Sequence, residues 1–158
     1  MAATKKFLPY AFFTGLLAGT MDLCGAVINY VIAHGNFPYK ILEYIASGAF
    51  GKTAMDGSTA SNLWGLFFHY FIAMSFTLFY FYIYPRVKFL QKNVLLSAVL
   101  YGIFVWCVMN LAILPLLKIA PVPTKWDSIV RGAVILMFCI GLPISLIVSG
   151  YYLSKVKR

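Results

Sequence analysis

The sequence predicts an all-α fold: an integral membrane four-helix bundle forming one domain over residues 1–158. Two observations carry this prediction. First, 62% of the residues are hydrophobic and only 11% are charged, whereas soluble domains carry about 25% charged residues. Second, four apolar runs each reach the roughly 20 residues that a bilayer-crossing helix needs. These runs cover about residues 7–33, 63–84, 94–117 and 129–152.

The first run places its small and polar residues at steps of three or four, which is one face of a helix. Gly15, Gly19 and Gly25 lie on this face, where small residues let a second helix approach closely. Asp22 and Asn29 share the same face. Because charge is costly inside a bilayer, an ionisable residue in a span marks either a functional site or a buried polar contact.

The connection over 35–61 is too long and too apolar for a simple turn. Pro38 at a first-turn position and Gly48 at the end predict a short helix over about 38–47. Ten residues cannot span a bilayer, so this helix either lies flat at the outer interface or dips in as a re-entrant element, and we favour the flat arrangement. Glu43 is its only candidate for a buried acid.

The remaining runs repeat the pattern of small and polar residues on one face. The second carries Gly65 and His69, four residues apart, and the third carries Trp106 and Asn110 at the same spacing. We expect Gly65 to pack against another helix. In the fourth run, Pro143 predicts a bend near residues 141–143, because proline inside a helix frees a carbonyl.

The Lys and Arg residues are concentrated in the segments that are expected on one side of the membrane. Eight of the thirteen Lys and Arg residues lie near the two ends of the chain and in the loop 86–92, whereas the other two connections are nearly neutral. This is the positive-inside pattern, so both termini are expected in the cytoplasm. The same distribution argues against a nucleic-acid partner and makes the lipid bilayer the expected one.

No motif predicts an enzyme, a cofactor or a metal site. The three cysteines, Cys24, Cys107 and Cys139, stand singly in three different spans, so disulfide and zinc sites are disfavoured. A haem would need both His34 and His69, and His34 sits at a span end. Hydrolase triads, phosphate-binding loops and zinc-protease motifs are absent from the sequence. We therefore expect no catalytic residues and no cofactor.

Several motifs together resemble those of a known group of proteins. They are the run from Pro38 to Gly51, Gly65-Leu66-x-x-His69, Tyr84-Pro85-Arg86 and Trp106-x-x-Met109-Asn110-Leu111. The chain resembles small four-helix bacterial membrane proteins with no assigned function and, more loosely, YagU-type inner-membrane proteins. This resemblance implies a bacterial inner-membrane location and implies no catalytic residue.

Depth along the spans decides which polar residues can meet. Helical rise puts Asp22 near the bilayer centre and Asn29, His69 and Asn110 in the outer half. We expect these four to share one polar cavity, with Glu43 of the short helix and Trp106 of the third run also within it. The cavity predicts binding or transport of a proton, an ion or a small ligand. Alternatively, the polar residues only hold helices together.

Two other functions stay open on the sequence. The chain is a structural or accessory subunit of a larger membrane complex, or an interfacial enzyme acting on lipid or quinone head groups. A homo-oligomer is also expected, because four short helices leave small-residue faces unused.

Overall fold

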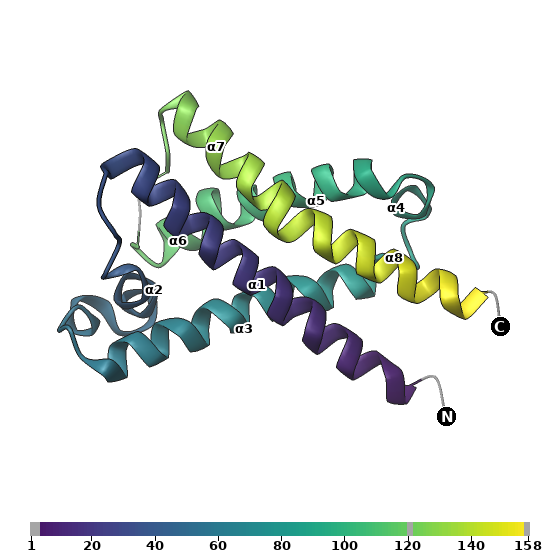
Figure 1. Cartoon of the computed structure of the whole chain (residues 1–158), viewed down its shortest axis with the longest axis horizontal. Helices are drawn as coiled ribbons and strands as arrows, with labels where there is room; N and C mark the ends of the chain where they lie inside the picture. The colour runs from purple at the N-terminus through teal and green to yellow at the C-terminus, as the bar shows by residue number, and fades with distance from the viewer. Residues whose placement is uncertain (1–3, 120–121, 157–158) are drawn as a thin grey trace.

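A computed structural model describes residues 4–119 and 122–156, and in these residues the fold is all-α, as predicted. Four long helical stretches run between the two ends of the molecule (Figure 1). They are α1 (Thr4–His34), α3 (Thr59–Ile83), a third made of α5 (Val94–Cys107), the π-helical η2 (Val108–Ile113) and α6 (Leu114–Leu116), and a fourth made of α7 (Trp126–Leu136), the π-helical η3 (Met137–Gly141) and α8 (Leu142–Val156). Three short elements complete the fold: α2 (Ile41–Phe50), the 3-10 helix η1 (Gly51–Ala54) and α4 (Lys88–Lys92).

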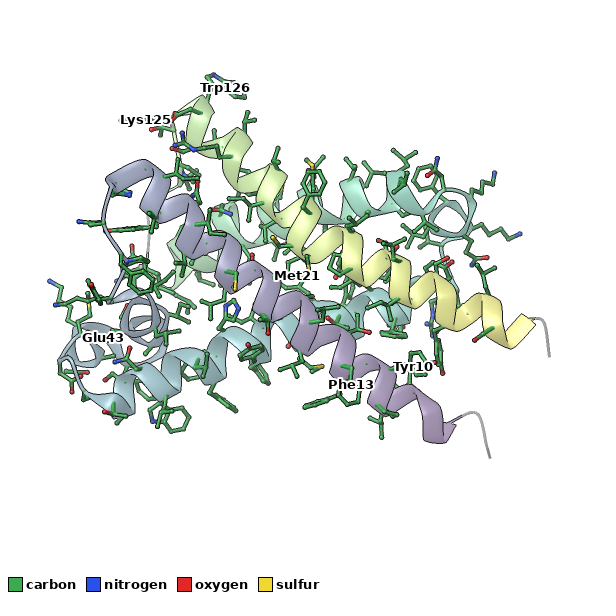
Figure 2. The ribbon with its side chains drawn as sticks, viewed as in Figure 1. Tyr10, Phe13, Met21, Glu43, Lys125 and Trp126 are labelled. Carbon is green, nitrogen blue, oxygen red and sulfur yellow. The ribbon has the colours of Figure 1, made fainter. Side chains whose placement is uncertain are left out.

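All four stretches are long and apolar enough to cross a membrane, over Phe7–His34, Thr59–Ile83, Val94–Leu116 and Trp126–Ser154. Their outer surface is apolar too. Phe13 projects from α1 (Figure 2) with 66% of its side chain exposed, and Leu116 is 81% exposed. Large hydrophobic side chains exposed along whole helices are suited to lipid rather than water. The chain is therefore a multi-pass membrane protein.

α3 begins at Thr59, four residues before the start of the apolar run that predicted it. The cause is a local cap: the Ser58 hydroxyl accepts a hydrogen bond from the backbone N–H of Ser61 (3.1 Å). Asp56 supports this turn, since its carboxylate accepts from the Ser58 N–H (3.0 Å) and the Ser61 hydroxyl (2.9 Å). These hydrogen bonds, the Ser58 N–H above all, hold the pKa of Asp56 below its ordinary value.

The two ends of the bundle differ. α1 begins and α8 ends at the end of the molecule that holds α4, whereas α2 and η1 lie at the opposite end, where α2 crosses the long helices instead of running along them (Figure 1). α2 starts and stops three residues later than predicted. The Pro38 carbonyl first accepts the Ile41 N–H in a turn, and Gly51, with φ of 69°, ends the helix in place of Gly48.

Aromatic side chains fill the core in the half of the bundle nearest the termini. Side-chain hydroxyls join the helices there. Tyr101 of α5 donates to the Phe76 carbonyl (2.6 Å), Ser145 of α8 donates to the Tyr80 hydroxyl (3.0 Å), and Tyr152 of α8 donates to the Phe81 carbonyl (3.1 Å). Tyr80 and Phe81 are fully buried. This half is a packed core in which α5 and α8 are hydrogen-bonded to α3.

The third and fourth stretches approach each other at two glycines. A Cβ on Gly102 would overlap the backbone of Met137, and one on Gly141 would overlap the Ala98 carbonyl. Each stretch also widens into π geometry that ends two residues before a proline, Pro115 or Pro143. Proline lacks an N–H and its ring clashes with the carbonyl four residues back, so the wider turn accommodates it. The irregularity expected near 141–143 thus takes the form of η3.

Candidate functional site

A cavity of about 500 Å³ lies in the half of the bundle away from the termini. α1, α3, the third stretch and the α7–η3 part of the fourth enclose it, and α2 lies against one end. We call it the Asp22 cavity, and its lining is made of Asp22, Leu23, Ala26, Ile41, Tyr44, Ile45, Gly48, Ala49, Phe68, His69, Phe71, Ile72, Ala73, Phe76, Val105, Met109, Ile113, Leu114, Leu117, Ile119, Leu136 and Ile140. Of the described lining residues, only Asp22, His69 and Tyr44 bring polar side chains to an otherwise apolar wall.

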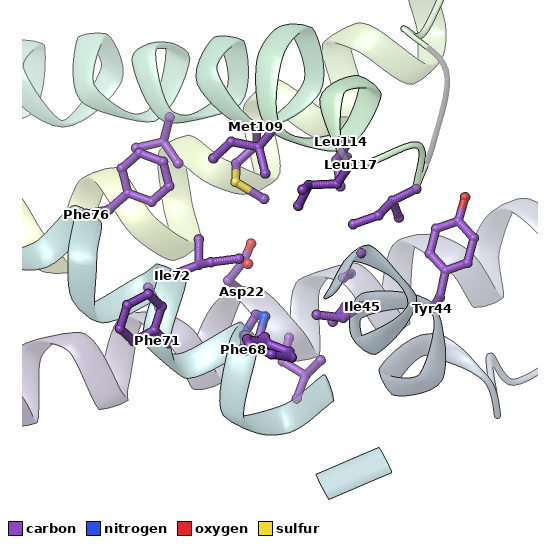
Figure 3. Close-up of a pocket in the computed structure, with 18 of the residues that line it drawn as sticks. Asp22, Tyr44, Ile45, Phe68, Phe71, Ile72, Phe76, Met109, Leu114 and Leu117 are labelled. Carbon is purple, nitrogen blue, oxygen red and sulfur yellow. The ribbon is translucent and has the colours of Figure 1, made fainter. Parts of the chain in front are cut away.

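The Asp22 carboxylate points from α1 into this cavity (Figure 3). Phe68, Ile72 and Phe76 of α3 and Met109 of the third stretch surround it in the same view. Within the described residues, no hydrogen bond reaches the carboxylate and no cation lies within 4 Å of it. An ionisable group inside a membrane normally has such a partner, so the open carboxylate is the chemical centre of the cavity.

His69 of α3 faces the same cavity but is tied to α1. Its Nε2 lies 2.7 Å from the Gly19 carbonyl oxygen. Because a carbonyl only accepts, Nε2 carries a hydrogen and donates it. One residue further along α1, the hydroxyls of Thr20 and Tyr70 lie 2.8 Å apart in a second contact between these helices. His69 therefore holds α1 against α3 while its Nδ1 keeps no partner among the described residues.

The glycines singled out in the sequence lie where backbones come close. A Cβ on Gly15 would press on Met74, one on Gly19 on Tyr70 and Ala73, and one on Gly25 on Ile135 and Cys139. At Gly65 the added carbon would overlap the backbone of Leu42 in α2. Gly15 and Gly19 thus let α3 pack closely against α1, and Gly25 does the same for η3. Gly65 lets the short helix α2 pack closely against α3.

Four residues expected in the site do not line the cavity. The Asn110 amide donates to the Trp106 carbonyl on its own helix (3.1 Å), and the Trp106 ring meets the helix face at Gly132. Glu43 is 3% exposed in α2, and its Oε2 has no partner in the described part of the chain. Asn29 lies about two turns beyond Asp22 along α1. Of the six residues expected to share one cavity, the described lining contains Asp22 and His69.

Most of the cavity wall consists of residues that carried no signal in the sequence. Ile45 comes from α2, and Leu117 and Ile119 follow α6. These residues are hydrophobic, like most of the chain. The periodicity of hydrophobic residues could therefore not distinguish them from residues that face lipid. The position of α2 between Pro38 and Gly51 was the one available clue.

The site offers no metal-binding set. Among the described residues, no three His, Cys, Asp or Glu side chains group closely enough to hold a metal ion. Arg131, the cation nearest in sequence to the cavity wall of the fourth stretch, pairs with Asp127 at 3.0 Å on the surface. Cys24, Cys107 and Cys139 are free thiols. What remains is one carboxylate and one imidazole facing an apolar space.

The chain was also compared with known proteins. No protein-family model, no curated protein and no solved structure matches it.

Proposed function

We propose that this protein binds a small ligand inside the membrane, in the Asp22 cavity, either to hold it or to carry it across. One observation carries the proposal: among the described residues, a carboxylate with no hydrogen-bond or ion-pair partner faces a cavity of about 500 Å³ lined by all four spans. Ligand pockets have volumes of about 300–1,000 Å³ and are mostly apolar with a few convergent polar groups.

The apolar wall favours a ligand with an apolar body over a bare ion. An ion crossing a bilayer needs several polar ligands to replace its water, and here only Asp22 and His69 are available beside the outlying Tyr44. The Tyr44 hydroxyl points away from Asp22 in Figure 3. Phenylalanine, isoleucine and leucine side chains make up most of the remaining wall. They are suited to contacts with hydrocarbon.

A second function, that of a structural subunit in a larger membrane complex, is favoured by the hydrogen bond between His69 and the Gly19 carbonyl. Polar contacts of this kind fix the register of neighbouring helices. That role explains His69 but leaves the open carboxylate of Asp22 without a purpose. Ligand binding accounts for both residues.

We also propose that the end holding α4 and both termini faces the cytoplasm, in a bacterial inner membrane. The charge count supports this orientation, since eight of the thirteen Lys and Arg residues belong to that end. The Asp22 cavity then lies in the half of the bundle nearer the outer surface. The bacterial location is supported by the resemblance described above.

The proposal is tested by screening small organic fragments of all charges against the protein in lipid nanodiscs, with ¹³C-methyl methionine as the probe. Met109 lines the cavity, whereas Met55 lies outside it after η1. Binding should shift the Met109 signal and leave Met55 in place. Ala26→Phe is the blocking variant, because Ala26 lines the cavity one turn from Asp22 on the same helix face.

Two results contradict the proposal. Either no fragment shifts Met109, or the shifts persist unchanged in Ala26→Phe. A flux assay in liposomes with a fragment that binds then separates transport from simple binding.

A further inference from the structure

The cavity has a chemical preference that follows from its two polar groups, and this inference rests on the function proposed above. We propose that the ligand of the Asp22 cavity is a lipophilic monocation, an ammonium group carried on an apolar body. The geometry points to this class through the hydrogen-bonding capacity of Asp22 and His69, the absence of a protein cation in the wall, and the aromatic residues beside them.

Both polar groups offer lone pairs to the cavity. A carboxylate is only an acceptor, and a neutral imidazole that donates from Nε2 keeps an acceptor at Nδ1. His69 commits its Nε2 hydrogen to the Gly19 carbonyl at 2.7 Å, so in the neutral form its remaining nitrogen accepts. The complement of two acceptors is a group that only donates, and an ammonium is such a group.

The charge of the wall points the same way. Among the described residues, no Lys or Arg side chain lines the cavity, and Arg131 is held by Asp127 on the surface. An anionic ligand would meet the Asp22 carboxylate with no cation to offset it, and like charges in a low-dielectric site repel strongly. If His69 is charged, it neutralises Asp22 and still gives an anion no net attraction. Divalent metal ions lack a third ligand among the described residues.

The aromatic side chains complete the match. Phe68, Phe71 and Phe76 of α3 line the same cavity as Asp22. Aromatic faces attract cations, and the attraction grows when water is excluded. The same rings bury the apolar body of the ligand. A wall with one acid, one imidazole and several phenylalanines therefore fits a cation with a hydrocarbon body better than a neutral or anionic molecule of the same shape.

Three probes of one shape test this preference: 1-adamantylammonium, 1-adamantanol and 1-adamantanecarboxylate, titrated into the wild-type protein in nanodiscs at neutral pH. The Met109 methyl shift reports occupancy of the cavity. We expect the ammonium to bind about 10- to 100-fold more tightly than the alcohol, as a charge-assisted hydrogen bond in a dry site allows. The carboxylate should not bind. This comparison needs no variant, so it holds even if a mutant fails to fold.

Asp22→Asn should bring the affinity for the ammonium down to that for the alcohol, because asparagine keeps the shape and removes the charge. Asp127→Asn is the matched control: it removes the same charge from an exposed ion pair, 59% exposed at the acid, and should leave all three affinities unchanged.

Equal binding of alcohol and ammonium, tighter binding of the carboxylate, or an undiminished affinity of Asp22→Asn for the ammonium would each overturn the inference. Failure of the ammonium to reach Met109 would overturn it too. In all these cases the proposed function survives if any fragment binds the cavity and is blocked by Ala26→Phe, and it falls with the inference if none does.

Discussion

α2 closes one end of the cavity by packing on α3 at Gly65. The substitution Gly65→Ala tests this packing. A Cβ at Gly65 would stand 2.9 Å from the Leu42 Cα and overlap the carbonyl of the same residue. Because both atoms belong to the backbone of α2, no side chain can turn aside to make room. The short helix must retreat by on the order of 1 Å.

The expected magnitude combines two opposing terms. Alanine in place of glycine favours a helix by about 0.5–1 kcal/mol. Overpacking a tight contact costs about 1–3 kcal/mol, so the net loss of stability is about 1–2 kcal/mol. Gly150→Ala is the control, because a Cβ on Gly150 in α8 meets nothing within 4 Å. That variant should be neutral or slightly stabilised.

The assay combines thermal unfolding in detergent with thiol labelling. A cysteine is introduced at Ile45, which lines the cavity from α2 and is half-buried, after the native cysteines have been replaced by alanine. Labelling of this cysteine should be slow with Gly65 present and several-fold faster in Gly65→Ala, because α2 is displaced. If Gly65→Ala has the same thermal stability and the same labelling rate as Gly150→Ala, then α2 does not pack on α3 as described.

Three further predictions concern the core, the start of α3 and the membrane orientation. Tyr101→Phe removes the hydrogen bond to the Phe76 carbonyl and should cost about 0.6–1.7 kcal/mol in detergent unfolding, whereas Tyr39→Phe, at a side chain 81% exposed, should cost nothing measurable. The hydrogen bonds to Asp56 lower its pKa in the folded protein. They therefore stabilise the fold fully above the ordinary pKa of an aspartate, and this stabilisation is lost as the pH falls through the lowered pKa of the folded state. The melting temperature should decline between about pH 5 and pH 3, and this decline should be absent in Asp56→Asn. A cysteine at Gln91 should be protected from an impermeant thiol reagent added outside intact cells while one at Ser58 is labelled, and the reverse pattern would invert the proposed orientation.

The four spans could be predicted from the sequence because their length and apolar character are set by the bilayer. The position of Asp22 within α1 likewise followed from its place in the run. The cap at Ser58 extended α3 beyond its apolar residues, so hydropathy alone placed that boundary four residues late. Local hydrogen bonding decides such ends, and apolar patterning does not report it.

The composition of the site was harder to predict because it depends on how each helix is rotated about its axis. Asn110 and Trp106 have the spacing of one helix face. In the structure, however, Asn110 lies in the π-helical η2, and its side-chain amide donates a hydrogen bond to the Trp106 carbonyl. A π segment shifts the register of every residue after it. Because Asn110 lies inside this π segment, a regular helical repeat could not show from the sequence that Asn110 misses the cavity.

The Asp22 carboxylate is open to an apolar cavity, and its chemical reactivity tests this openness. Dicyclohexylcarbodiimide, an apolar reagent for carboxyl groups, is added to the protein in nanodiscs, and the modified residues are identified by mass spectrometry. We predict modification at Asp22, its loss in Ala26→Phe, and reaction of the exposed Asp56 and Asp127 only with a water-soluble carbodiimide. An unmodified Asp22 in the wild-type protein, or modification that persists at the same rate in Ala26→Phe, would contradict the account.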